Sequence, residues 1–480
     1  MRRFALPLAV VLTTLALIIA GCGGGGDGGG VQPPPPIQIG PGPGAAADVV
    51  PTEPGVDTTA ARNAPQATNP LAANVRQVVT NEFDAILDDP PDTGAQLQTL
   101  LTRFTAWVHQ DPDDPAAQTG LALLTAIAGI YNTGIDAGFA EGDILPTSLV
   151  KDRALDLDIA GLFMRPMEFA AELQFFGPQA LQNGTKGPKA VIPGLEGDGI
   201  TTEDLQIAVR NYLLPLLDDA IARLGALANN TNASDPVIVI GSGDDEINVY
   251  RADFKILTVI LRLFKATAHE LIAYQLNAGA YDWGVDLVDR DANGNGLLGV
   301  AEYAPADPFL WRHSAPNMQI AGETYRAAIN NMIWAVNNSA NSALLDTLDA
   351  QDATDLATML GDLRALISQR VDVAVTYENV APAQVLPAAT ANIPVNFGAI
   401  FDNPVDDIKD LLPKLHVVCD GASNCWAEVQ DENDFPDLTF NGLFPQPQQI
   451  VNIMDGDYNH VTLTYGSLED IEIVTPWWFY

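Results

Sequence analysis

Basic side chains are scarce in this chain. Lysine and arginine number 23 against 61 aspartates and glutamates over 480 residues, so the formal net charge is −38 at pH 7. A surface this negative repels the phosphates of nucleic acids and of anionic lipids, and it attracts cations. We therefore expect no nucleic-acid partner. The acidity itself fits either plain solubility, as in a saline habitat, or a specific role for a cation such as calcium.

Signatures of catalysis are also missing. The five histidines are scattered along the chain: His109, His269, His313, His416 and His460. His269 and Glu270 begin like the motif of zinc proteases, but Ala273 stands where the second histidine is needed. A polar pair on an amphipathic helix is the simpler interpretation, and carboxylates are too abundant for any pair of them to indicate a glycosidase. The sequence favours a protein that is not an enzyme, without excluding one.

Cysteine is rare, with three in the whole chain: Cys22, Cys419 and Cys425. The last two enclose a short stretch in which Gly421 allows a tight turn. We predict that they form a disulfide in an oxidising compartment. The alternatives are a metal-binding pair or two free thiols. His416 lies nearby, but two cysteines and one histidine do not complete a zinc site.

Long apolar stretches are absent beyond the N-terminus. Residues 254–277 are apolar in part, but they contain lysine and arginine, which bilayer insertion penalises by roughly 2.5–3.5 kcal/mol each. We predict a core helix there. Residues 4–19 form an apolar run that is shorter than the ~20 residues of a membrane-spanning helix, and a glycine tract follows soon after it.

The first 22 residues have the pattern of an export signal. Two arginines precede the apolar run, and the sequence Ile-Ala-Gly-Cys ends at Cys22 without any acidic residue before it. This pattern resembles the signal peptide and lipobox of bacterial lipoproteins. The resemblance implies that residues 1–21 are removed and that Cys22 becomes a lipidated N-terminus in the bacterial cell envelope. Gly23 after the cysteine implies sorting to the outer membrane in a Gram-negative organism; the alternative is an uncleaved anchor.

Residues 22–70 have almost no large apolar side chains. The stretch is rich in glycine and proline at first, and then in alanine, threonine, asparagine and proline. Glycine-rich chains are flexible coils and proline-rich chains are extended spacers, so a coil of this length reaches on the order of 35–40 Å. We predict a disordered tether that holds the body above the membrane.

Residues 71–375 read as a helical domain. Apolar residues recur at three-and-four spacing, and we expect helices in the segments 75–87, 97–108, 121–131, 148–173, 202–229, 251–277, 317–338 and 354–370, with a small hairpin over 237–250. Residues 111–122 resemble the start of a tetratricopeptide repeat, but no second copy follows at the 34-residue period. The prediction is a mainly α fold, either an irregular helical bundle or a helical-hairpin array.

Residues 376–480 lose the helical pattern. Short alternations of apolar and polar residues, separated by proline, asparagine and aspartate, predict a small, partly irregular β-containing region that the cysteine pair staples together. The chain ends in four aromatic residues, 477–480, which we expect to dock onto the protein's own core. If exposed, they would instead form a surface that contacts a partner or stacks on a sugar.

Residues 291–302 carry the strongest motif. Oxygen-bearing side chains stand at its first, third, fifth and twelfth places: Asp291, Asn293, Asn295 and Glu302. This spacing resembles the calcium-binding loop of EF-hand proteins. The resemblance implies that these side chains and the Leu297 carbonyl bind calcium, that Gly296 makes the sharp turn, and that Leu298 points inward. The alternative is an ordinary Asn-Gly turn capped by Glu302.

The loop departs from the EF-hand pattern in two ways. Only two direct ligands carry a formal charge, so we expect a dissociation constant on the order of 10⁻⁴–10⁻³ M. Pro305 and Pro308 cut the exiting helix short, and no second loop of equal quality is present. A single shortened loop in an exported protein indicates a structural clamp.

Two functions are consistent with these features. We favour an envelope-anchored, calcium-stabilised helical lipoprotein that serves as a binding or structural module for an unknown protein or glycan partner. The alternative is an envelope hydrolase or polysaccharide-capture lipoprotein with a cleft between the helical body and the C-terminal region.

Overall fold

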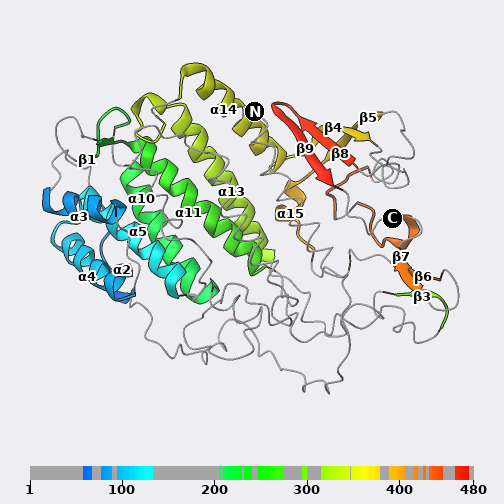
Figure 1. The fold of residues 1–480 in the computed structure, drawn as a ribbon, viewed down its shortest axis with the longest axis horizontal. Coiled ribbons are helices and arrows are strands. Elements are labelled where there is room, and N and C mark those ends of the chain that lie inside the picture. Colours follow the sequence, from blue (N-terminus) through cyan, green and yellow to red (C-terminus); the bar gives the residue numbers. More distant parts are fainter. Residues whose placement is uncertain are drawn as a thin grey trace, which may run out of the picture.

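The computed structural model describes residues 58–67, 77–88, 94–132, 206, 209–229, 232–240, 247–273, 294–299, 315–345, 348–378, 389–405, 410, 414–419, 425–428, 432–439, 441–446 and 460–474. Within these ranges the protein is mainly α, with a few small antiparallel sheets (Figure 1). The fold class predicted from the sequence is confirmed at this level. The signal peptide, the segment 148–173 and the terminal aromatic residues lie outside the described ranges. None of the described helices is long and apolar enough to cross a membrane.

The helices follow the apolar spacing of the sequence. They are α2 (Thr59–Arg62), α3 (Gln77–Asp88), α4 (Gly94–Gln110), α5 (Pro115–Asn132), a π-helical turn (Val209–Leu213) leading into α10 (Leu214–Asn229), α11 (Arg251–Leu271), α13 (Ala315–Val336), α14 (Ala350–Leu366) and the short α15 (Gly398–Asp402). From α4 onward, each long helix packs against the next described one, as far as α14. In Figure 1 they lie side by side across the molecule.

Helix α5 lies at the centre of the N-terminal half. The Asp114 carboxylate caps its first turn by accepting a 2.9 Å hydrogen bond from the Ala117 amide, and Pro115 takes the first helical position, where no amide hydrogen is needed. Residues 115–129 of α5 are buried throughout. Gly120 allows this packing, because a Cβ there would lie 2.1 Å from the Phe104 ring.

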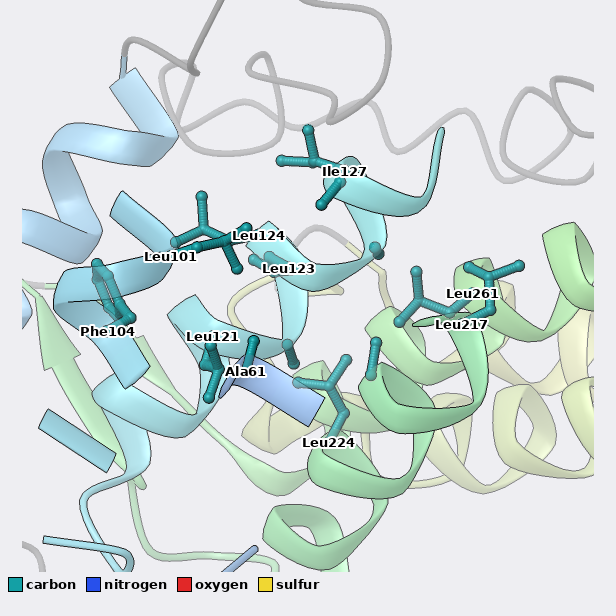
Figure 2. Close-up of a cluster of buried hydrophobic side chains, with 14 of the residues drawn as sticks. Ala61, Leu101, Phe104, Leu121, Leu123, Leu124, Ile127, Leu217, Leu224 and Leu261 are labelled. Carbon is teal, nitrogen blue, oxygen red and sulfur yellow. The ribbon is translucent and has the colours of Figure 1, made fainter. Parts of the chain in front are cut away.

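Two apolar clusters fill the helical part. The first contains side chains of α2, α3, α4, α5 and α10 and of one side of α11. Figure 2 shows side chains of α4 and α5 gathered opposite Leu217, Leu224 and Leu261. The second cluster joins the other side of α11 to α13 and α14, and it includes Phe401 of α15. Helix α11 therefore has core on two sides, as expected of a core helix.

Three antiparallel sheets complete the described structure. Strands β1 (Ile238–Ile240) and β2 (Ile247–Val249) form the predicted hairpin. A four-stranded sheet has the order β5-β4-β8-β9, with β4 at Val371–Glu378, β5 at Ala389–Val395, β8 at His460–Tyr465 and β9 at Leu468–Val474. The third sheet has the order β3-β6-β7, with β3 at Leu297–Leu298, β6 at Leu415–Cys419 and β7 at Cys425–Glu428.

Residues 58–67 belong to the packed body, although the sequence predicts a tether there. They contain α2, and the side chains of Ala61, Ala64 and Ala67 are buried in the first cluster. The sequence gives little sign of this, because three alanines bury little area and no large apolar residue marks the segment. The segment is instead held by its main-chain carbonyls, several of which accept hydrogen bonds from the buried Arg223.

The helical body and the C-terminal region meet in a tight seam. Gly322 of α13 lies directly against Phe401, where a Cβ would come within 2.4 Å of that side chain. The Arg326 guanidinium forms two hydrogen bonds to the Asp402 carboxylate, at 2.8 and 2.9 Å, and also binds the Ile367 carbonyl. At this described contact, side chains fill the space between α13 and α15.

Candidate metal centre

Half of the predicted calcium loop falls within the described residues. Asn295 and Leu297 belong to the described stretch 294–299, whereas Asp291, Asn293 and Glu302 lie outside it. Gly294 and Gly296 have φ angles of 64° and 73°, in the left-handed region that glycine adopts without penalty. Nothing lies within 4 Å of a Cβ built at either glycine, so backbone conformation and not crowding favours glycine here.

The side chain of Asn295 stabilises this turn. Its Oδ1 accepts a hydrogen bond of 2.8 Å from the Leu297 amide. The next residue, Leu298, is fully buried, as the loop pattern predicts for that place. The described part of the loop therefore has a sharp turn at the sixth place and an inward apolar side chain at the eighth.

Strand β3 attaches the loop to the hairpin of β6 and β7. Leu297 lies opposite His416, Leu298 lies opposite Leu415, and the Val417 amide donates to the Gly296 carbonyl at 2.8 Å. The loop is thus joined to a strand more than 100 residues later in the chain. The spacing within residues 291–302 gave no sign of this pairing.

The β6–β7 hairpin contains the two C-terminal cysteines. Cys419 is disulfide-bonded, and its Cα partner across the hairpin is Cys425, in agreement with the predicted pair. A disulfide-bonded cysteine has no thiolate to offer a metal, which removes Cys419 from the alternative metal-binding pair. His416 Nε2 lies 2.9 Å from Asp434 Oδ1. Among the described residues no group of three or more His, Cys, Asp or Glu could hold a metal ion.

The helices on either side of the predicted calcium loop, α11 and α13, contact each other where α11 ends and α13 begins. Asn317, in the first turn of α13, donates from Nδ2 to the Ile272 carbonyl at the end of α11, at 3.3 Å. Its Oδ1 lies 3.2 Å from Nδ1 of His269. The predicted calcium loop therefore lies between two helix ends that contact each other, and its strand β3 pairs with β6.

The pair His269 and Glu270 faces two different sets of partners. Burial lowers the pKa of His269, and Asn317 opposes this by hydrogen bonding to the ring. The Glu270 carboxylate accepts from the Tyr325 hydroxyl at 3.2 Å, and that hydroxyl also lies 3.2 Å from Thr267 Oγ1. Although part of the Glu270 residue reaches the surface, burial raises its pKa to about 8. The polar-pair interpretation accounts for these contacts, while the spacing of the sequence gave no indication of Tyr325.

Replacing Glu270 with glutamine is expected to raise the melting temperature at pH 7–8 and to leave it nearly unchanged at pH 4. The pKa of Glu270 in the folded protein, about 8, lies above the ~4.3 of an unfolded glutamate. The contribution of Glu270 to the free energy of unfolding is therefore fully present below pH ~4.3 and is lost as the pH rises toward 8. Glutamine keeps an acceptor for Tyr325 and has no proton to lose. Melting followed by circular dichroism from pH 4 to 9 tests this, with the exposed Glu323→Gln on α13 as the control. Parallel curves for wild type and Glu270→Gln would contradict it.

The described structure thus brings Asn295 and Leu297 next to the disulfide hairpin of Cys419. Cys22, the predicted lipidation site, lies outside the described residues. No protein-family model, curated protein or solved structure matches the chain.

Proposed function

We propose that this protein is a bacterial envelope lipoprotein whose helical body is stabilised by calcium and acts as a binding or structural module. Its lipid would be attached to Cys22 and hold it at the outer membrane. The observation that carries the calcium assignment is the backbone of residues 294–298. It combines positive φ at Gly296 with a buried Leu298 and an anchored β3, which supports the loop pattern over an ordinary turn.

The residues at this site fit calcium by their chemistry. Calcium takes six to eight hard oxygen ligands in a flexible cage, and the loop offers carboxylate, amide and carbonyl oxygens. The side chains of Asp291, Asn293, Asn295 and Glu302, with the Leu297 carbonyl, would hold the ion. Bound there, calcium would neutralise the acidic charge of the loop and link its ends, which supports a structural role.

The arrangement of the helices supports the helical-hairpin array over the irregular bundle. Among the described helices, each long one from α4 to α14 contacts the next, as in stacked hairpins. Such arrays expose extended surfaces and commonly serve in binding. No described residue favours the alternative of an envelope hydrolase.

Calcium is expected to raise the free energy of unfolding by about 1.4–2.7 kcal/mol at 10 mM, if the dissociation constant is on the order of 10⁻³–10⁻⁴ M. The measurement is thermal and urea unfolding of the mature chain, with calcium or with a chelator. The change Glu302→Gln removes a bidentate ligand and should abolish the shift. Asp372→Asn removes one exposed carboxylate from β4 and should retain it. An equal shift in both variants would show that calcium acts through overall charge. No shift in the wild type would contradict a calcium site at residues 291–302.

Lipidation at Cys22 is expected to be lost when this residue alone is changed. Expression of the full chain in a Gram-negative host with a labelled fatty acid should label the wild type and place it in the membrane fraction. Cys22→Ser should be unlabelled, because serine lacks the thiol that accepts the lipid. Cys425→Ser keeps Cys22 and should remain labelled. Label in the Cys22→Ser variant would contradict the assignment.

A further inference from the structure

Arg223 of α10 is fully buried and uses all its nitrogens in hydrogen bonds. Its Nε donates to Asp219 Oδ2 at 2.8 Å, within the same helix. Its Nη1 donates to the Pro65 carbonyl and to Gln118 Oε1, both at 3.0 Å. Its Nη2 donates to the carbonyls of Ala61 and Ala64, at 2.9 and 2.8 Å. Three of its partners are therefore main-chain carbonyls of residues 58–67.

A second side chain of the helical body forms a hydrogen bond to the same segment. Gln118 of α5 donates from Nε2 to the Pro65 carbonyl at 2.9 Å and to the Pro112 carbonyl at 2.7 Å. Its Oε1 accepts from Arg223, so the two side chains hold each other in place. We call Arg223, Gln118 and Asp219 the carbonyl clamp.

The residues of the carbonyl clamp come from two helices that pack against each other. Asp219 and Arg223 are one turn apart on α10, and Gln118 stands on α5, which packs directly against α10. Apolar side chains of both helices belong to the first cluster (Figure 2). Residues 58–67 contribute only three buried alanine side chains to this core. They are recognised through their backbone and their small size, which is how a receptor recognises a peptide.

We infer that α4, α5 and α10 form a peptide-binding site for a short alanine-rich segment, filled in this structure by residues 58–67 and able to accept the same segment from a second copy of the chain. The contacts made in cis and in trans would be identical. The covalent link changes only the effective concentration of the segment, so a second copy can compete when the link is cut or when copies are crowded on one membrane. The inference stands independently of the calcium site and gives the proposed binding module a defined surface.

The test uses the full mature chain with a protease recognition sequence inserted between residues 70 and 74, in the link between the segment and α3. After cleavage, the N-terminal fragment should stay bound and co-elute with the body in gel filtration. A labelled synthetic peptide of residues 56–68 should then replace the fragment. Its binding should produce a saturable rise in fluorescence anisotropy, and excess unlabelled peptide should reverse that rise. A peptide with Ala61→Leu and Ala64→Leu should fail to bind, because the buried alanines leave no room for larger side chains.

Two variants link this binding to the carbonyl clamp. Gln118→Ala should lower the affinity for the labelled peptide about tenfold, since it removes one hydrogen-bond donor to Pro65 and one acceptor for Arg223. Arg364→Ala removes an exposed arginine from α14 and should leave the affinity unchanged. Loss of the fragment on cleavage without uptake of labelled peptide would overturn the inference. Retention of the fragment without any exchange would also overturn it, because the segment would then be a fixed part of the fold. Repeating the assay with a chelator separates this result from the calcium proposal.

Discussion

Replacing Arg223 with methionine is expected to lower the free energy of unfolding by about 3–5 kcal/mol. The change leaves the Asp219 carboxylate without its ion-pair partner and removes the donors to three carbonyls of residues 58–67. Burial already raises the pKa of Asp219, and Arg223 is the main group that opposes this. Urea unfolding followed by circular dichroism measures the loss.

Two further variants separate the buried pair from ordinary charge effects. Arg223→Met combined with Asp219→Leu should recover part of the lost stability, because it removes the unpaired carboxylate as well. Arg103→Ala breaks the ion pair with Glu82 at the surface of the same half of the protein and should cost only about 0.2–1 kcal/mol. A loss for Arg223→Met no larger than that for Arg103→Ala would contradict the central role of Arg223.

Replacing Asp253 with alanine is expected to cost about 2–5 kcal/mol. Its carboxylate is 1% exposed and accepts from the Tyr250 amide at the start of α11. It also accepts from the Ser342 hydroxyl at 2.6 Å and from the amides of Ala343 and Leu344, in the turn after α13. Alanine would leave the buried Ser342 hydroxyl and three half-buried amides without their acceptor.

Asp349 provides a matched comparison for Asp253. It caps α14 by accepting from the amides of Gln351 and Asp352, but it does so at the exposed end of that helix. Water can replace the lost acceptor there, so Asp349→Ala should cost only about 1 kcal/mol. Denaturant unfolding of both variants tests the difference. Equal losses would show that Asp253 is a helix cap and nothing more.

The helices and most of their limits could be predicted because apolar periodicity and helix caps are local features. The predicted segments 251–277, 317–338 and 354–370 correspond to α11, α13 and α14, with ends that differ by a few residues. The C-terminal β-containing region could be predicted for the same reason, although β4 begins at Val371, five residues before the expected boundary.

Buried polar partners could not be predicted in this way. Arg223 and Ala61 are 162 positions apart, and Ser342 is 89 positions from Asp253. A single arginine or aspartate in a sequence with 61 acidic residues shows no sign of being buried. The same limit explains the assignment of residues 58–67 to the tether, since their docking depends on a side chain from a distant helix.

Neighbouring residues were enough to predict the mainly α class, the lipoprotein-like start, the close pair of C-terminal cysteines and the EF-hand-like spacing of residues 291–302. Three contacts, by contrast, follow only from the packing of distant segments: β3 pairs with the cysteine hairpin, Phe401 packs against Gly322, and the carbonyl clamp holds residues 58–67. Those contacts join distant parts of the chain, and they are specified by which surfaces remain once the local elements have packed.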